Sequence, residues 1–469
     1  MKSKIAKKFK FDRFDIVILG IFVAFFSALL IIGEPIYVND TYQYDNQMIM
    51  REPGYALLMQ VTRYILPENY YELIIIIQNI LAMICNTVFI IFIRKCFNVN
   101  KALVLLFTSI MLAPHIMTPI CSATHLILTN SLMTEAILFS LFPLSILFLI
   151  NAIKSGNPLG KESIIAILYC FFVTLVRGQM MVLYVVWFIV MSIMVLFKKD
   201  SADKKVRIKR KVCNIFVIGV IFCLVFVSRS VVTHIYNYCQ NGLFVDTISR
   251  DALSYSNVLY AADREDGEAI EDEGLRNLFY EMYDAADANK MNYKYSPKGL
   301  LNKAIHHELC HDDINFIYFS EPAKQYIADT KRIYIQQFQE VMIEVDNVAA
   351  ELTKELIPEL FGTYVVNYIA IITQGFIRTV AYMHPLLAWY ALAVYIFAIV
   401  VTIVLWRKNS KSIPAAFMAF TLLGIVGNVC ATGLMLQCIS RYMIYYMPMF
   451  YIAGILELLE LWHISKNKI

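Results

Sequence analysis

The feature that most constrains this chain is a series of ten apolar runs separated by polar segments. A helix that crosses a membrane needs about 20 mostly apolar residues. The chain is 59% hydrophobic and 17% charged, whereas soluble proteins carry about 25% charged residues. We therefore predict an all-α polytopic membrane protein with about ten transmembrane helices. The runs lie at 15–33, 72–93, 102–120, 132–152, 163–176 (short, and extendable to Gly178), 180–197, 213–233, 386–406, 413–434 and 443–462.

Basic residues are unevenly distributed between these runs. Cytoplasmic loops carry an excess of Lys and Arg, and the basic segments all fall on the side that an even number of spans assigns to both termini. We predict cytoplasmic termini in a multi-pass protein of the cell membrane, bacterial by its Ile-, Lys- and Asn-rich composition. No small-x-small cleavage site follows the first run, which indicates an uncleaved anchor. The basic segments are MKSKIAKKFK, RKCFNVNK, KSGNPLGK, 198–211, WRKNSK and HISKNKI.

The charged region between the seventh and eighth runs is the large soluble part of the chain. Its Leu275, Leu278, Phe279 and Met282 have the spacing of an amphipathic helix, and we predict a small helical extracytoplasmic cap. The stretch 364–383 is apolar enough to span, but a span there would move WRKNSK to the outer side, so we expect an interfacial or re-entrant helix. The predicted parts are an N-terminal membrane domain (1–233) with a first outer loop (34–71), an extracytoplasmic segment (234–385) and C-terminal membrane helices (386–469).

Several charged residues lie near the predicted outer ends of the spans, where charge is costly and usually functional. Single arginines often only reach toward lipid phosphates, but so large a set on one side indicates a shared site. A carboxylate can take a proton from an acceptor hydroxyl, and arginines can bind a phosphate and stabilise its developing charge. A lipid-linked phosphate would lie at this depth. The set is Asp40, Asp45, Arg51, Glu135, Arg177, Arg378 and Arg441.

Four short stretches occur in an order that resembles a known family. They are NDTYQYDNQMIMREPGYALL, LTNSLMTEAILFSLFPLSILFLI, TLVRGQMMVLYVVWFIV and SRYMIYYMPMFYI. Together they resemble the polyprenyl-phosphate-sugar-dependent glycosyltransferases of the GT-C fold, in particular the dolichyl-phosphate-mannose–protein mannosyltransferase-like group of bacteria. The resemblance covers most of the membrane domain but not residues 234–363.

The resemblance implies a membrane glycosyltransferase with a polyprenyl-phosphate sugar donor, inversion at the anomeric carbon, and an extracytoplasmic acceptor that is a cell-wall polymer, a glycolipid or a protein. It makes Asp40 the catalytic base and Asp45 the competing candidate, because Asp40-Thr41 stands where the family often has Asp-Glu or Asp-Ser. The donor-phosphate candidates are Arg51, Arg177 and Arg441. The substrate-binding candidates are Tyr44, Tyr55, Glu135 and Tyr442, with Glu135 equally open to a role in ordering the helices.

Other functions compete with this interpretation. A polysaccharide polymerase or ligase of the O-antigen type would place its essential residues in the large outer loop and not after the first span. A transporter would carry polar residues near the membrane midplane, which are sparse. Membrane lipid is an expected partner and nucleic acid is not, because the one dense basic run, 198–211, lies between spans and faces lipid head groups.

The segment AIHHELCHDD contains His307-Glu308-Leu309-Cys310-His311, which matches the H-E-x-x-H pattern of zinc proteases. Two aspartates follow directly, and no clear third ligand stands out. We favour a solvated helix face over a zinc site, assign no metal ligand, and leave a divalent metal requirement open. The cysteines show no paired metal spacing; Cys239 and Cys310 lie in the polar segment, and a disulfide between them is not our preferred interpretation.

Overall fold

The structure is a computed structural model that describes residues 11–121, 126–197, 204–248 and 250–466. Within these ranges the chain forms helices and no strand, apart from one isolated β-bridge between Ile36 and Ser131. The predicted fold class, an all-α polytopic membrane protein, is confirmed. Residues 1–10, 198–203 and 467–469, which supply part of the predicted basic pattern, lie outside the described ranges.

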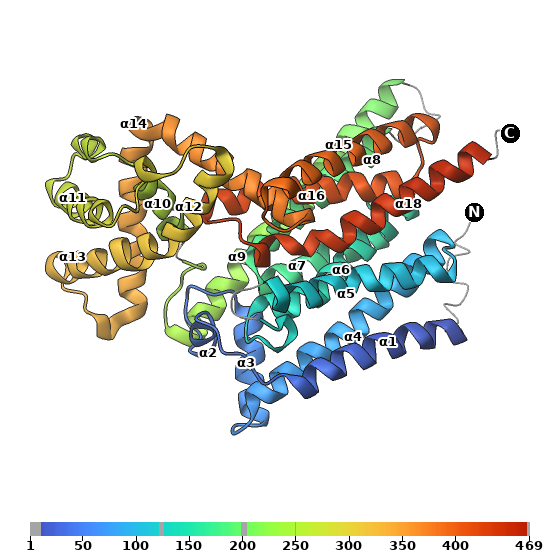
Figure 1. Ribbon diagram of the computed structural model, residues 1–469, viewed down its shortest axis with the longest axis horizontal. Coiled ribbons are helices and arrows are strands. Elements are labelled where there is room, and N and C mark those ends of the chain that lie inside the picture. Colours follow the sequence, from blue (N-terminus) through green and yellow to red (C-terminus); the bar gives the residue numbers. More distant parts are fainter. Residues whose placement is uncertain (1–10, 122–125, 198–203, 249, 467–469) are drawn as a thin grey trace.

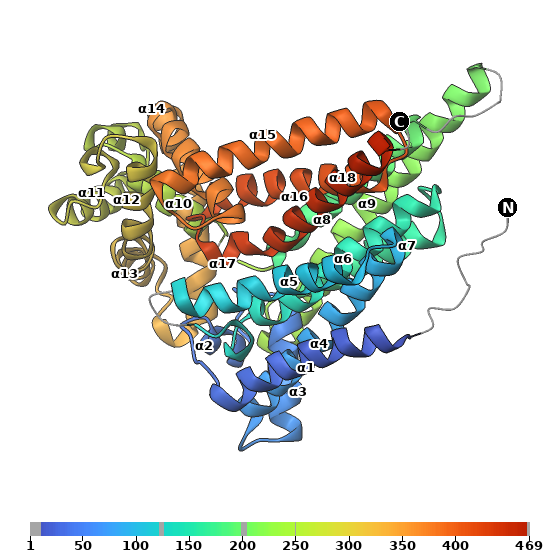
Figure 2. The same cartoon turned by 45° about the vertical axis from the view of Figure 1, so that its right-hand side comes forward.

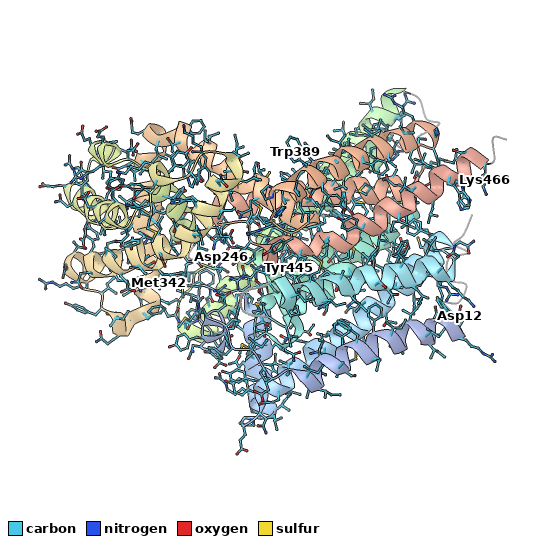
Figure 3. The ribbon with its side chains drawn as sticks, in the orientation of Figure 1. Asp12, Asp246, Met342, Trp389, Tyr445 and Lys466 are labelled. Carbon is cyan, nitrogen blue, oxygen red and sulfur yellow. The ribbon has the colours of Figure 1, made fainter. Side chains whose placement is uncertain are left out.

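A bundle of long helices makes up the larger part of the molecule (Figures 1 and 2). Asp12 and Lys466 lie at one end of this bundle, and Met342 lies beyond the opposite end (Figure 3). The helices of the bundle are α1 (Arg13–Ile32), α4 (Tyr70–Phe97), α5 (Lys101–Cys121), α6 (Thr134–Ser155), α7 (Lys161–Val176), α8 (Val182–Phe197), α9 (Lys204–Asn241), α15 (Pro385–Lys408), α16 (Ile413–Met435) and α18 (Met447–Lys466).

The helices of the bundle differ in how much of their apolar surface the protein itself covers. In the most apolar 18-residue segment of α6, 72% is buried inside the protein, whereas the corresponding values are 22% in α1 and 17% in α9. Lipid is as apolar as a core side chain, so a membrane helix needs no protein partner on its outer face. α6 is therefore central, and α1 and α9 are peripheral.

Ion pairs join α1 and α4 at the end of the bundle that holds Asp12. The carboxylate of Asp15 is fully buried and pairs with Arg94 at 2.7 Å and with Lys95 at 2.6 Å. Asp12 caps the start of α1 and pairs with Arg94 at 2.9 Å. Since α4 ends where α1 begins, the two helices are antiparallel, and the loop between them lies at the other end of the bundle.

In the part of the chain that the structure describes, ten helices are long and apolar enough to cross a membrane, but this set differs from the predicted one in one member. The fifth predicted run forms α7, whose 16 residues fall short of the usual length. α7 nevertheless lies between α6 and α8: Tyr169 donates to the carbonyl of Leu141 at 3.1 Å, and Trp187 donates to the carbonyl of Ser163 at 3.0 Å.

The helix that replaces α7 in that set is α14 (Phe338–Val380), which contains most of the apolar stretch 364–383. Tyr368 donates to the carbonyl of Cys430 near the end of α16, and Tyr451 near the start of α18 donates to the carbonyl of Val380. Cys430 and Tyr451 both lie toward the end of the bundle that is opposite Asp12. The stretch is thus continuous with a helix of the cap and packs against that end of the bundle.

The cap is formed by α10 (Arg250–Ala261), α11 (Glu273–Ala288), α12 (Leu300–Asp313), α13 (Glu321–Lys331) and the first half of α14 (Figure 1). It has an apolar core of its own. The predicted amphipathic stripe of α11 is buried in that core at all four positions, Leu275, Leu278, Phe279 and Met282. Burial of one apolar stripe with the charged face left in solvent is the expected behaviour of a surface helix.

Candidate functional site

The loop after α1 is attached to the segment before α6 by backbone hydrogen bonds. Ile36 donates to the carbonyl of Asn130 at 2.8 Å, and Leu132 donates to the carbonyl of Ile36 at 3.0 Å. The hydroxyl of Thr41 donates to the carbonyl of Leu132 at 2.9 Å. These bonds bring Asp40, which precedes α2 (Thr41–Asp45), close to Glu135 in the first turn of α6.

Two buried tyrosines lie behind this loop. Tyr44 of α2 and Tyr55 of α3 (Pro53–Ile65) pack edge to face with ring centroids 5.0 Å apart. Tyr55 donates to Gln78 of α4 at 2.9 Å. Burial raises the pKa of Tyr44 to about 12, so its hydroxyl keeps its proton. Tyr55 thus supports the site from behind, while the hydroxyl of Tyr44 reaches the polar cluster.

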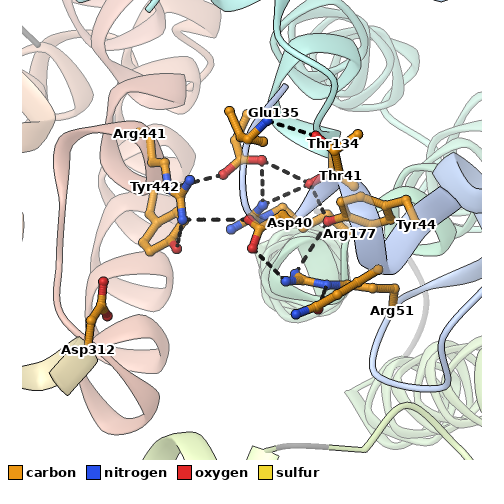
Figure 4. A network of polar contacts seen from close by, with 12 residues as sticks. Asp40, Thr41, Tyr44, Arg51, Thr134, Glu135, Arg177, Asp312, Arg441 and Tyr442 are labelled. Carbon is orange, nitrogen blue, oxygen red and sulfur yellow. Dashed lines mark hydrogen bonds and ion pairs between the residues drawn. The ribbon is translucent and has the colours of Figure 1, made fainter. Parts of the chain in front are cut away.

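Glu135 is fully buried and forms the centre of that cluster (Figure 4). Arg177, which follows α7, pairs with Glu135 at 2.9 Å and donates to the hydroxyl of Thr134 at 2.8 Å. Thr134 also lies 3.0 Å from Glu135 and 3.3 Å from the hydroxyl of Tyr44. A buried carboxylate is tolerated where a cation and hydrogen bonds compensate for lost hydration, and Arg177 and Thr134 provide both.

Arg441 joins the cluster from the C-terminal part of the chain. It lies in the short α17 (Ser440–Met443), 3.6 Å from an oxygen of Asp40 and 3.6 Å from an oxygen of Glu135. Its short contact, at 2.7 Å, is to the hydroxyl of Tyr442, whose ring also lies 4.8 Å from the guanidinium of Arg177. Arg441 is thus near both carboxylates but has a close hydrogen bond to neither.

Asp40, unlike Arg441, has a close ion pair. It pairs with Arg51 at 2.7 Å, and Arg51 also donates to Gln43 at 2.6 Å. Burial alone would raise the pKa of Asp40, but Arg51, Arg441 and Arg177 together hold it below its usual range. Asp40 therefore stays ionised, and with 20% of its side chain exposed it is within reach of a substrate.

The structure separates Asp45 from this cluster. Asp45 accepts hydrogen bonds from Tyr70 at 3.0 Å and Tyr71 at 3.1 Å, and it pairs with Arg63. Arg378 also forms no ion pair with Asp40 or Glu135 in the described structure. It pairs instead with Glu308 of the cap at 2.8 Å. Of the predicted residues, the structure brings together Asp40, Tyr44, Arg51, Glu135, Arg177, Arg441 and Tyr442.

A second ionic group lies beside the cluster and was not predicted. Arg229 of α9 is 2% exposed and pairs with Asp246 at 2.7 Å and with Glu52 at 3.4 Å. Gly178 is packed so closely that a Cβ atom there would collide with the carboxylate of Glu52. Glu52 follows Arg51 and Gly178 follows Arg177, so the pair of Arg229 with Glu52 lies directly beside two arginines of the cluster. In the sequence, Arg229 is noticeable only as a charged residue inside the seventh apolar run, 213–233.

The H-E-x-x-H segment lies on α12, and the prediction of a solvated helix face is wrong for its two histidines, because His307 and His311 pack into the protein and are buried. His307 donates from Nε2 to the side-chain oxygen of Asn257 at 2.7 Å, and burial keeps the pKa of His307 well below its usual value. Glu308 is paired with Arg378. Among the described residues no three His, Cys, Asp or Glu side chains are grouped to hold a metal ion. Cys239 and Cys310 are free thiols, the first exposed and the second buried.

No family model, curated protein or solved structure matches this chain.

Proposed function

We propose that this chain is a membrane glycosyltransferase that moves a sugar from a polyprenyl phosphate to a hydroxyl acceptor at the cap end of the bundle. The observation that supports this best is the position of Arg441, 3.6 Å from both Asp40 and Glu135. Arg441, which can bind a phosphate, and Asp40, which can accept a proton, thus belong to one partly exposed cluster. The three arginines Arg51, Arg177 and Arg441 outnumber the two carboxylates they pair with, which favours an anionic ligand.

Arg441 is the best candidate for the donor phosphate. Arg51 and Arg177 are already engaged at short distance by Asp40 and Glu135, whereas the carboxylate contacts of Arg441 are long. A phosphate offers several oxygens to a guanidinium in bidentate geometry, and its negative charge increases as the sugar leaves. Arg441 can turn toward such a ligand without breaking a short ion pair.

Asp40 is the proposed base. The acceptor oxygen attacks the anomeric carbon while the bond from that carbon to the phosphate oxygen breaks. The bonding electrons leave with the phosphate, and the hydroxyl proton passes to Asp40. A single displacement of this kind inverts the anomeric configuration, and a positioned base contributes about 10²- to 10⁴-fold to such a step.

The lowered pKa of Asp40 fits this role only if the substrate changes its surroundings. A carboxylate held by arginines is a weak base, because its charged form is already stabilised. A bound phosphate that draws Arg441 away removes part of that stabilisation and raises the basicity of Asp40. Donor binding thereby prepares the carboxylate for the acceptor.

The orientation of the protein in the membrane also belongs to this proposal. The basic segments favour cytoplasmic termini, with the cap and the cluster on the extracytoplasmic side of a bacterial cell membrane. The lipid tail of the donor would lie in the bilayer beside the bundle. The acceptor, a cell-wall polymer, glycolipid or protein, would approach from the cap.

The test is transfer from labelled polyprenyl-phosphate sugars in membranes that contain the protein. Wild type should consume a donor, Asp40→Asn should not, and Asp45→Asn should do so nearly as well as wild type. Consumption of no donor by the wild type would reject the proposal. An Asp40→Asn variant with full activity, together with essential residues only in 234–363, would favour a polymerase or ligase of the O-antigen type.

A further inference from the structure

The connection between α16 and α17, residues 436–439, ends directly before the helical turn that carries Arg441. The contacts of Arg441 with Asp40 and Glu135 are long, so these carboxylates do not by themselves fix its position. The backbone on both sides of Arg441 contributes: the connection precedes it, and the carbonyl of Tyr442 accepts from Gln179 and Asn428. The contacts of the connection with the cap therefore bear on where the guanidinium lies.

The first contact comes from Asp312, near the C-terminal end of α12. Its carboxylate accepts a hydrogen bond from the side chain of Gln437 at 2.9 Å. The same oxygen lies 3.2 Å from Nδ1 of His311, whose ring is buried. Figure 4 shows Asp312 on the side of the cluster occupied by Arg441 and Tyr442.

The second contact begins at Glu308, one helical turn earlier. Glu308 pairs with Arg378 of α14 at 2.8 Å and accepts from Gln374 at 2.6 Å. Arg378 in turn donates to the carbonyl of Cys438 at 3.2 Å. α14 is pressed against the connection here, since a Cβ atom at Gly375 would lie 3.0 Å from the side chain of Cys438.

The third contact passes through α10. His307 bonds to the side-chain oxygen of Asn257 at 2.7 Å, and the amide of Asn257 donates to the carbonyl of Leu434 at 3.2 Å. Leu434 belongs to the last turn of α16. The three residues of α12 that make or relay these contacts, His307, Glu308 and Asp312, all come from the segment that resembles a zinc motif.

We infer that α12 positions Arg441 by holding the connection between α16 and α17 from the cap side. This inference rests on the proposed function, in which Arg441 binds the donor phosphate. Glu308, through Arg378, and Asp312 are positioning residues, because neither contacts Arg441 through a hydrogen bond or ion pair among the described residues. An acceptor that moves α12 on entering the cap would also move Arg441, so the cap couples acceptor binding to the donor site.

Hydrogen–deuterium exchange tests the positioning without requiring any activity. In the purified full chain, Glu308→Ala and Asp312→Ala should each raise exchange of the backbone amides in 436–443. Asp313→Ala is the matched control, since it removes the same charge from the next residue, whose carboxylate has no hydrogen bond or ion pair in the described structure. Unchanged exchange in both test variants, or an equal increase in the control, would overturn the inference.

Binding of polyprenyl phosphate to the same proteins tests the consequence. Glu308→Ala should weaken binding by about tenfold, as expected when one charge-assisted hydrogen bond is lost, and Glu308→Gln should recover part of it because its amide oxygen still accepts from Gln374. In an Arg441→Ala background, Glu308→Ala should cause no further loss, because it acts through the missing side chain. An additive loss would overturn the positioning role.

The two measurements separate the two proposals. If the wild type binds no polyprenyl phosphate, the proposed function fails, while raised exchange at 436–443 in the test variants would still show that α12 holds the connection. If the wild type binds and neither Glu308→Ala nor Asp312→Ala differs from it, the positioning inference fails and the proposed function stands.

Discussion

Asp40 and Asp45 lie at the two ends of one short segment and have entirely different surroundings. Asp40 meets Arg51 and Arg441, the second of which comes from the far end of the chain. Asp45 meets Arg63, Tyr70 and Tyr71, which lie 18 to 26 residues further along the chain. The difference teaches that distance along the chain does not by itself sort the two carboxylates: Arg51 lies only 11 residues from Asp40, and what sets Asp40 apart is its contact with Arg441.

The largest effect is expected for Asp40→Asn, which removes the proposed base. Transfer should fall by about 10²- to 10⁴-fold, while the variant should still fold because Asn can accept a hydrogen bond from Arg51. Initial rates with a labelled polyprenyl-phosphate sugar, beside a thermal melt of the same sample, provide the measurement. A variant that melts normally and keeps more than a tenth of the activity would remove Asp40 from the reaction.

Arg229→Met and Arg63→Met compare a buried ion pair with an exposed one. Arg229 is 2% exposed, and its loss leaves the partly exposed carboxylates of Asp246 (27%) and Glu52 (16%) without their closest cation, at a cost of at most about 3–5 kcal/mol. Arg63 is 45% exposed, and its pair contributes about 0.2–1 kcal/mol. Unfolding in detergent micelles should separate the two variants clearly; similar melting temperatures would contradict the structural role of Arg229.

Arg441→Ala should lower transfer by about 10²- to 10³-fold, the usual result of removing a group that stabilises developing negative charge. Arg441→Lys should keep part of the activity, because it retains the charge but loses the planar, bidentate geometry. Arg63→Ala is the matched control and should change transfer little. Equal losses in Arg441→Ala and Arg63→Ala would show that the rates report folding and not phosphate binding.

The dependence of transfer on pH follows from the lowered pKa of Asp40. A base must be ionised to accept a proton. The rate of transfer should therefore stay constant as the pH falls, and it should decline only below the usual pKa range of an Asp carboxyl. Arg51→Gln removes the nearest cation, which raises the pKa of Asp40 and moves the decline to higher pH. A profile of kcat/KM against pH measures this shift, and an identical acid limb in both proteins would argue against Asp40 as the titrating group.

The smallest effect is expected for Asp45→Asn. Its hydrogen bonds from Tyr70 and Tyr71 can persist with an amide oxygen, and the exposed pair with Arg63 contributes little. Transfer should stay within about threefold of wild type, since no arginine of the site contacts Asp45 and an exposed pair contributes at most about 1 kcal/mol. A loss as large as that of Asp40→Asn would reverse the assignment of the two carboxylates.

Much of the site could be selected from the sequence, because charged residues at the ends of apolar runs are few and each has a cost in lipid. Glu135, Arg177 and Arg441 were identified in this way. Arg229 was missed because it lies inside an apolar run, where its partners Glu52 and Asp246 could not be known. The separate pairing of Arg378 with Glu308 was equally invisible, since Glu308 belongs to α12 of the cap and Arg378 to the last turn of α14.

The sequence by itself determined that this chain is a bundle of membrane helices with a helical cap. Hydropathy is a property of short segments, and the thickness of the bilayer sets the length that each segment needs. Only the tertiary structure decided that Asp40 and not Asp45 meets Arg441, that α14 runs unbroken from the cap to the end of the bundle, and that the segment resembling a zinc motif contacts the connection before Arg441. These outcomes depend on which charges lie within a few ångströms of one another after folding, because the interaction of two charges weakens with distance. Residues that are far apart in the sequence can meet at such distances, and the sequence does not show which of them do.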